Sequence, residues 1–490
     1  MKKVGLGILS AGALLLAVML LKTASFTSRQ IAVEPVAAAE VDGQRAARNL
    51  SRAIQFKTFS DQAPRKSNSA EFKAFHGFLE EAFPRIHRNL QREIIADNSL
   101  LYTWKGSDDS LAPILLTAHL DVVPVAADTE DDWTYPPFAG RIADNYIWGR
   151  GSLDDKGCLL ATLEAVEVLL GDGYIPRRTL YLAYGHDEED GGRGGAAKIA
   201  ALLQSRKVKA EWILDEGGSI TVGIVPGVSQ PVALVGIAEK GYLTLELTVE
   251  QEGGHSSMPP PRSAIGILCS AIHHLQNDPF PAKLEGPTRE LFEFAGPEMS
   301  FGMKFLFANQ WLLGPLIKIQ LAKANSTNAG IRTTFAPTII AGGTKENVLP
   351  QAARAVVNFR LYPGDSIGYV VEHVKKAIDD PRVQVRPSGP DANEASPVSA
   401  VDSPSFQVLQ RTVGQIFPEA IVAPFLMLAG TDTKHYAGLS DNIFRFLPMY
   451  LTSADLERIH GTNERLGVDN YEKFIAFYIQ MIRNSNKILE

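Results

Sequence analysis

Three short apolar runs in this chain each end next to side chains that can bind a metal ion. Such runs, with no alternation of polar residues, are typical of strands buried on both faces of a sheet. In open α/β sheets the ligand crevice lies just beyond the carboxyl ends of the strands. The runs therefore predict an α/β fold and a metalloenzyme site at one edge of its sheet. Along the chain they are residues 114–118 before His119-Leu120-Asp121, residues 179–184 before His186-Asp187-Glu188-Glu189, and residues 212–214 before Asp215-Glu216.

The composition limits which side chains could hold such a metal. With 45% hydrophobic and 21% charged residues among 490, the chain has the make-up of an ordinary globular protein. Its two cysteines, Cys158 and Cys269, lack the spacing of a zinc motif, so histidines and carboxylates must supply the ligands. A net charge of −7 without any basic block argues against a nucleic-acid partner.

The N-terminus has the features of a targeting segment. Lys2 and Lys3 precede an apolar stretch of about 18 residues, and Lys22 closes it, a length between that of a signal peptide and that of a spanning helix. We therefore interpret residues 1–24 as a membrane anchor or a cleaved signal, and residues 25–40 as a tether. Either alternative predicts a membrane-anchored or secreted protein with its catalytic domain outside the cytoplasm.

The pattern of apolar residues changes in the middle of the chain. Residues 243–250 alternate strictly between apolar and polar, and residues 355–361 form a second alternating stretch, a pattern typical of antiparallel strands with one solvated face. We therefore predict an inserted α+β domain over residues 237–392, and a catalytic domain formed by residues 41–236 and 393–490.

Residues 301–321 of the insert are rich in Phe, Leu, Ile and Trp. A second membrane contact is one interpretation of this stretch. Lys304, Gln310 and Lys318 interrupt it, however, so the pattern favours an amphipathic helix packed on the protein.

The polar residues at the strand ends form motifs with a chemical meaning. His119 and Asp121 lie two apart and hence on one side of a strand end, where the imidazole can bind a metal and the acid can orient it. Asp154 and Asp155 stand among glycines before a helix. Helix capping explains one such acid but not both.

Two further motifs contain clustered acids or a histidine. Residues 187–190 place four carboxylates after a strand, where they repel one another unless a cation lies among them. Asp215-Glu216 repeats the pattern, and residues 459–465 supply a second histidine, His460, in a polar turn.

Together these motifs resemble the M20 family of co-catalytic zinc peptidases and deacylases. The most similar branch is the carboxypeptidase S group, which includes N-fatty-acyl amino acid synthase/hydrolases, and the resemblance extends from about residue 45 almost to residue 490. It implies an α/β zinc-peptidase catalytic domain with a central mixed, largely parallel sheet flanked by helices, plus the inserted α+β lid/dimerisation domain. It also implies two Zn²⁺ per subunit, which Co or Mn could replace at His and carboxylate ligands.

The resemblance assigns roles to the residues of the motifs. Asp215 would bind one zinc with His119, Glu189 the other with His460, and Asp154 would bridge both. The implied metal ligands are thus His119, Asp154, Glu189, Asp215 and His460. Asp121 would be the orienting acid and Glu188 the general base. The Asp154–Asp155 peptide bond is typically cis in the family, a costly geometry that would mark a functional site.

The resemblance also predicts four substrate-binding residues. His255 matches the family's lid histidine, which reaches a neighbouring active site across a dimer and stabilises the oxyanion. Asn347 and Arg360 match substrate-binding positions, and Gly430 belongs to a glycine turn beside the substrate. Arg360 suits a carboxylate because the planar guanidinium binds both of its oxygens.

These assignments predict a di-zinc hydrolase that cleaves an amide bond next to a free C-terminal carboxylate, as a carboxypeptidase or dipeptidase does. Water activated between the metals would attack, with Glu188 as general base. An N-acyl amino acid also presents an amide beside a carboxylate, so hydrolysis or synthesis of fatty-acyl amino acids is the alternative. A non-catalytic, membrane-tethered binding protein is disfavoured because every ligand and the base are present. The expected partners are a small peptide or N-acyl amino acid, a membrane through the N-terminal segment, and a second subunit bound through the inserted domain.

Overall fold

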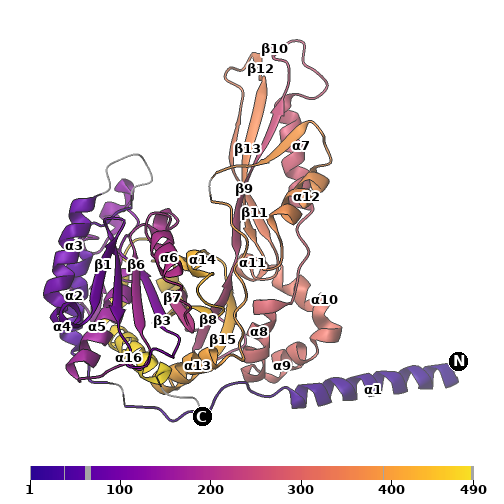
Figure 1. Ribbon diagram of the computed structural model, residues 1–490. Coiled ribbons are helices and arrows are strands. Elements are labelled where there is room, and N and C mark those ends of the chain that lie inside the picture. Colours follow the sequence, from indigo (N-terminus) through magenta and orange to yellow (C-terminus); the bar gives the residue numbers. More distant parts are fainter. Residues whose placement is uncertain (1, 38, 61–67, 390, 487–490) are drawn as a thin grey trace.

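A mixed eight-stranded sheet forms the centre of the catalytic domain in this computed structural model, which describes residues 2–37, 39–60, 68–389 and 391–486 (Figure 1). Four of its seven neighbouring strand pairs are parallel, and β6, β3, β7 and β16 are consecutive parallel neighbours, so their carboxyl ends meet at one edge. This confirms the predicted sheet. The strand order is β1 (Gln91–Ile95), β2 (Ser99–Trp104), β6 (Leu180–Gly185), β3 (Ile114–His119), β7 (Trp212–Thr221), β16 (Ile443–Leu451), β8 (Val232–Glu239) and β15 (Ile421–Met427).

Helices cover both faces of this sheet, which explains why its strands carry unbroken apolar runs. In β3, Ile114 and Leu116 belong to the large hydrophobic cluster on one face, whereas Leu115 belongs to the smaller cluster on the other. The larger cluster is built with α2 (Gly43–Ile54), α3 (Ser69–Ala82), α4 (Pro84–Asn89), α5 (Lys156–Gly171), α13 (Pro404–Ile416) and α16 (Val468–Ser485), and the smaller one with α6 (Ala196–Ser205) and α14 (Thr433–Tyr436).

A small antiparallel sheet places the two halves of the catalytic domain side by side. It has the order β17 (Arg465–Gly467), β5 (Tyr146–Trp148) and β4 (Arg141–Ala143), and Arg465 pairs with Trp148. The guanidinium of Arg465 also lies over the Trp148 ring, 4.5 Å from its centroid. Because β5 precedes Asp154 and β17 follows His460, this sheet brings those two loops together.

The predicted lid contains a four-stranded antiparallel sheet that projects from the catalytic domain (Figure 1). Its order is β11 (Thr334–Gly342), β13 (Ala352–Leu361), β9 (Gly241–Glu250) and β14 (Val383–Pro387), with α7 (Ala264–Asn277) and α12 (Ile367–Ile378) packed on it. Alternate residues of β9, from Leu243 to Val249, are buried in a separate hydrophobic cluster, as their alternation predicts. A two-stranded ribbon of β10 (Gly254–His255) and β12 (Val348–Leu349) lies at the end of the lid far from the catalytic sheet (Figure 1).

Three helices inside the predicted insert pack on the catalytic domain instead of on the lid sheet. They are α8 (Gly286–Ala295), α9 (Phe301–Ala308) and α10 (Gln310–Leu321), and the short helix α11 (Asn325–Ala329) follows them. The rings of Phe292 and Phe307 stack with centroids 4.2 Å apart, and Phe294 contacts Phe406 of α13 with centroids 5.7 Å apart. The stretch from 301 to 321 therefore forms two helices, which break at Asn309.

The N-terminal helix α1 (Lys2–Ser25) contains 20 residues, Leu6–Ser25, that are long and apolar enough to cross a membrane. It projects from the body beside α9, and most of its side chains are exposed (Figure 1). The segment after it runs along the catalytic domain. Gln30 both donates to the Val422 carbonyl (2.9 Å) and accepts from the Val422 N–H (2.8 Å).

Candidate metal centre

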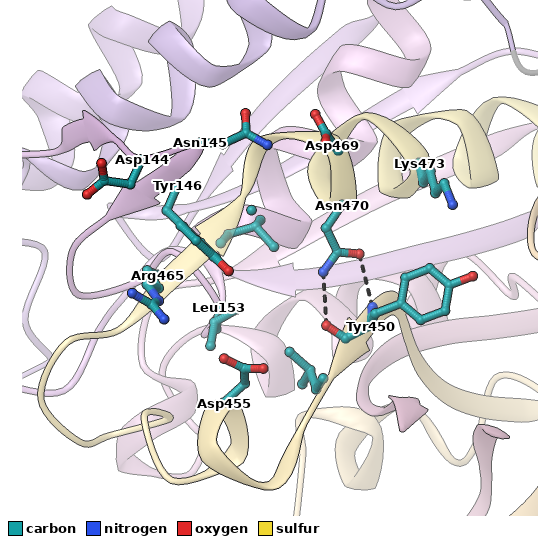
Figure 2. Close-up of a pocket in the computed structure, with 13 residues that line it drawn as sticks. Asp144, Asn145, Tyr146, Leu153, Tyr450, Asp455, Arg465, Asp469, Asn470 and Lys473 are labelled. Carbon is teal, nitrogen blue, oxygen red and sulfur yellow. Dashed lines mark hydrogen bonds between the residues drawn. The ribbon is translucent and has the colours of Figure 1, made fainter. Parts of the chain in front are cut away.

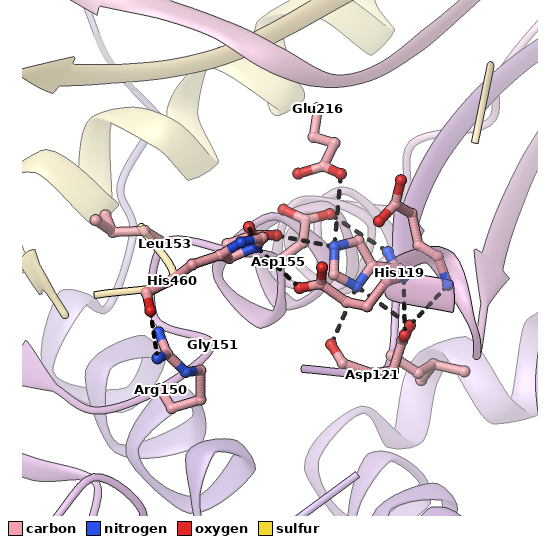
Figure 3. Close-up of polar contacts among 12 residues, drawn as sticks. His119, Asp121, Arg150, Gly151, Leu153, Asp155, Glu216 and His460 are labelled. Carbon is pink, nitrogen blue, oxygen red and sulfur yellow. Dashed lines mark hydrogen bonds and ion pairs between the residues drawn. The ribbon is translucent and has the colours of Figure 1, made fainter. Parts of the chain in front are cut away.

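The ends of the parallel strands bring a first group of metal-binding side chains together (Figure 3). His119 is the last residue of β3. Its Nε2 lies 2.9 Å from Asp154 Oδ1 and 3.5 Å from Glu216 Oε1. The donor atoms of these three residues are all within 4.8 Å of one another, a spacing at which they could hold one ion.

A second group shares Asp154 with the first. His460 Nε2 lies 2.9 Å from Asp154 Oδ2 and 3.2 Å from Glu189 Oε1. Glu189 lies in the turn that follows β6, and His460 lies in the loop before β17. Each oxygen of Asp154 thus faces a different histidine, which is the arrangement required of a carboxylate that bridges two ions.

The two acids of β7 occupy different environments. Glu216, not Asp215, is in the group with His119, and Asp215 belongs to neither group of described residues. Asp215 is buried, and its Oδ2 has no hydrogen-bond partner among the residues described. The pairing of β7 with β16 jumps between Asp215 and Gly218, which is a bulge, and bulges redirect side chains. Asp215 therefore remains a predicted ligand, and Glu216 is a competing candidate.

Asp121 lies where an orienting acid should lie. His119 Nδ1 is 3.0 Å from the Asp121 carbonyl oxygen and 3.3 Å from its Oδ1. The same carboxylate, completely buried, accepts the backbone N–H groups of Glu188 (3.2 Å) and Glu189 (3.1 Å). Asp121 thus fixes the imidazole and also the turn that carries the proposed base. The Asp154–Asp155 peptide bond is cis, as the resemblance predicts.

Cations suit this cluster because its carboxylates are buried close together. Burial raises the pKa of Glu188 well above its usual range, and Glu216 and Glu189 raise it further against the opposing effect of His119. Burial, with Asp154, raises the pKa of Glu216 to about 8. Burial would lower the pKa of His119, but Glu216, Asp121 and Asp154 outweigh it and raise the pKa well above 6.5.

The chain's donor set fits divalent metals. Glu189 Oε1 is buried without a hydrogen bond among the described residues, although it lies 3.2 Å from His460 Nε2. Two imidazoles and several carboxylates are the ligand types that zinc, cobalt and manganese accept.

A buried ion pair, not anticipated from the sequence, holds the two loops of the second group. Glu464 Oε2 lies 2.6 Å from Arg150 Nη1, and the Glu464 side chain is completely buried. Its Oε1 accepts the backbone N–H groups of Gly151 (3.0 Å), Leu153 (2.8 Å) and Asp154 (3.2 Å). Arg150 in turn donates to the carbonyl of His460 at 3.0 Å (Figure 3). The pair therefore ties the Asp154 loop to the His460 loop.

The four predicted substrate residues do not form one group in this single chain. His255 and Asn347 are exposed on the β10–β12 ribbon and its loop, where the Ser256 N–H donates to the Asn347 carbonyl at 3.2 Å. Arg360 lies on β13, its guanidinium 4.8 Å from the Tyr242 ring centroid, and burial lowers its pKa. Gly430 is in the exposed loop after β15, next to buried Thr431.

A polar pocket of about 490 Å³ lies beside Leu153 and does not include the proposed metal ligands (Figure 2). Arg465 and Lys473 line it together with Asp455 and Asp469, and Asn470 bridges it by hydrogen bonds to both backbone groups of Tyr450. Its mixed charges favour no single kind of ligand.

Comparison with known proteins identifies the family to which this arrangement belongs. Residues 115–484 match the model of peptidase family M20/M25/M40. The chain is 45% identical to "Probable carboxypeptidase S-like 2" of Dictyostelium discoideum, over 97% of this chain and 93% of that protein. It is 40% identical to "N-fatty-acyl-amino acid synthase/hydrolase PM20D1" of Xenopus tropicalis, over 91% and 87% of the two chains.

The fold is also that of a solved member of the family. The M20 family metallo-carboxypeptidase Sso-CP2 from Sulfolobus solfataricus superimposes with a TM-score of 0.63 at 18% identity, covering 89% of this chain and 98% of that one. The family match spans most of the chain, and relatives at 40–45% identity cover nearly all of it. This chain is a hydrolytic enzyme and belongs to peptidase family M20/M25/M40.

Proposed function

We propose that the protein is a two-metal amidohydrolase that cleaves an amide bond next to a free carboxylate. The observation that carries this proposal is Asp154, whose two oxygens each lie 2.9 Å from a different histidine, His119 and His460. His119, Asp154 and either Glu216 or Asp215 would hold one Zn²⁺. Asp154, Glu189 and His460 would hold the other.

The chain's own residues supply the remaining chemistry. When bound, two divalent cations would provide Lewis acidity and would lower the pKa of a bound water. Glu188 takes the proton of the attacking water and passes it to the departing amine, a role to which its half-buried position beside Glu189 suits it. Asp121 holds the imidazole of His119 and the turn that carries Glu188 in fixed positions relative to each other. Arg360 binds the substrate's carboxylate. The partial burial of Arg360 would strengthen this charged interaction.

Carboxypeptidase or dipeptidase activity is the first candidate, supported by the relative named "Probable carboxypeptidase S-like 2". Hydrolysis or synthesis of N-fatty-acyl amino acids is the second, supported by relatives of that name at 38–40% identity. To decide, kcat/KM is measured for a dipeptide and for a long-chain N-acyl amino acid with the same C-terminal residue. If one of the two kcat/KM values is much larger than the other, the substrate with the larger value identifies the substrate class. Amidated counterparts of both substrates are the controls, and the enzyme should not hydrolyse them, because they lack the carboxylate. Equal turnover of amidated and free substrates contradicts the proposal.

We also propose that the enzyme works as a homodimer in which His255 acts in the neighbouring subunit. The exposed position of His255 at the far end of the lid supports action in trans. His255→Ala and Glu188→Ala should each be inactive alone. After the two are mixed under conditions that exchange subunits, activity should reappear, because one subunit then has both residues available. No recovery, with subunit exchange demonstrated, contradicts action in trans.

For location, we propose that α1 is retained as a membrane anchor, with the catalytic domain outside the cytoplasm. Met19 and Thr23 are buried, unlike most of α1, because its last turns pack on the body. A cleaved signal peptide would discard these contacts. N-terminal sequencing of the mature protein tests this, since a new N-terminus near residue 39 would indicate a cleaved signal.

A further inference from the structure

We propose that α9 and α10 form a second membrane-contacting surface, which lies in the lipid interface beside the end of α1. The inference rests on the proposed anchoring by α1. Its occupant is a phospholipid bilayer with anionic headgroups.

The outer side of these two helices is apolar and exposed. Single exposed apolar residues are ordinary on a protein surface, but a cluster on neighbouring turns marks a contact. Phe307 and Ile317 point into the hydrophobic cluster of the catalytic domain, so the helices are fixed to the body. The exposed set is Phe301 (65% exposed), Trp311 (54%), Leu312 (39%), Leu316 (57%) and Ile319 (63%).

The contacts between α1 and these helices place them at the membrane boundary. Asn309, which is completely buried, donates to the Met19 carbonyl and to Thr23 Oγ1, both at 3.2 Å. Lys22, which closes the apolar stretch, has its ammonium 5.8 Å from the centroid of the Trp311 ring. Lysine and tryptophan are the side chains that collect at the lipid headgroups at the end of a spanning helix. Trp311 therefore lies at the depth where α1 leaves the bilayer.

The orientation of the body relative to α1 is also constrained. Gln30 binds both backbone groups of Val422, and the Gln410 side chain donates to the Arg29 carbonyl at 3.0 Å. Arg29 forms an ion pair with Glu290 of α8 at 3.0 Å. The segment after α1 is thus bound to the catalytic domain within a few residues. A membrane that contains α1 must then lie against α9 and α10.

The charge of this region complements an anionic surface. Residues 301–323 contain Lys304, Lys318 and Lys323 and no acidic residue, although the whole chain carries a net charge of −7. Apolar side chains flanked by lysines are characteristic of segments that lie in the plane of a membrane interface.

The test uses the full chain reconstituted into phosphatidylcholine/phosphatidylglycerol vesicles, with and without brominated acyl chains. Because the chain has five tryptophans, the emission of Trp311 is obtained as the difference between wild type and Trp311→Phe. We expect brominated lipid to quench this component and aqueous iodide not to reach it. Leu316→Glu with Ile319→Glu should abolish the quenching, whereas Ile94→Glu should not. Ile94 is a matched control, 51% exposed on β1 at the other side of the catalytic domain (Figure 1).

Any other pattern of quenching of Trp311 contradicts the proposed membrane contact. A Trp311 that iodide quenches and brominated lipid does not lies in water. A Trp311 reached by neither quencher is covered by protein, such as a second copy of the chain. Both results contradict this inference alone if the chain still floats with the vesicles and hydrolyses its substrate. A chain that does not float contradicts the proposed anchor as well.

Discussion

Replacing Glu464 by glutamine should weaken metal binding although Glu464 is not itself a proposed ligand. Its carboxylate accepts three N–H groups from residues 151 to 154 and pairs with Arg150, which holds the loop of His460. Glutamine keeps one oxygen for the N–H groups, but it turns an amide donor towards the guanidinium of Arg150. The substitution thus removes one half of a buried ion pair.

The size of the effect follows from the burial of both partners. Breaking a buried pair on one side costs about 3–5 kcal/mol, because the remaining charge loses its compensation. Arg150 keeps the carbonyl oxygens of His460 (3.0 Å) and Gly461 (3.1 Å) as acceptors, so we expect about 3 kcal/mol, the lower end. Loss of an outer contact of this kind lowers metal affinity about 10–100-fold.

Metal affinity is measured by competition with a chelator, and stability by urea unfolding of the metal-loaded and stripped protein. Glu164→Gln is the matched control, since Glu164 is a buried carboxylate of α5 that pairs with Arg45 and accepts from Asn49 at 2.6 Å. Both variants should lose stability, and only Glu464→Gln should lose metal affinity. If the affinity of Glu464→Gln stays within about twofold of wild type, the assigned positioning role is wrong. Adding Arg150→Met to Glu464→Gln should recover part of the lost stability, because the unpaired charge is then gone.

Three further predictions concern the metal groups directly. Glu188→Ala should lose nearly all turnover, about 10²–10⁴-fold, while metal analysis still finds both ions; near-normal turnover would refute its role as base. Of Glu216→Gln and Asp215→Asn, the variant that loses one of the two ions in metal analysis identifies the true ligand, and we expect it to be Glu216→Gln. In the metal-stripped protein, hydrogen bonds that the His460 ring donates to the carboxylates of Asp154 and Glu189 raise the pKa of His460 to about 10. Because this pKa is raised above its unfolded value near 6.5, the stability it contributes is complete below pH 6.5 and is lost as the pH rises through about 10. The free energy of unfolding of the stripped wild type, measured with urea, should therefore fall towards that of His460→Gln as the pH rises between these two values. If the free energies of unfolding of the two proteins depend on pH in the same way, this prediction is contradicted. Added metal should remove the difference between their pH dependences, since the ion binds neutral imidazole.

Local sequence patterns predict most of the fold because they reflect burial directly. The alternation of residues 243–250 predicts β9, and α5 begins at Lys156, directly after Asp154 and Asp155, which we expect to precede a helix. The stretch of residues 301–321 shows the limit of such patterns. Composition indicates a packed helix there, but the structure has two helices that meet at Asn309, whose side chain donates to α1, nearly three hundred positions earlier.

The metal groups show a second limit. Resemblance indicates five ligands, and the structure brings four of them, together with Glu216, into two groups. A choice between Asp215 and Glu216 depends on a bulge in β7 that only its pairing with β16 reveals. Gly217 lies at that bulge with a φ of +133°, and a Cβ there would come within 2.9 Å of Arg445. The contact of Arg150 with Glu464 spans 314 positions, and no local pattern predicts such a pair.

The pairing of β17 with β5 has a consequence for how the enzyme is made. Asp154 is synthesised early, but its partner His460 follows some three hundred residues later, after the whole lid. On the ribosome, the growing chain can therefore fold much of its first half before the two residues of the proposed metal centre can meet. On the proposed assignment of Asp154 and His460, hydrolytic competence arises only after nearly all of the polypeptide has emerged.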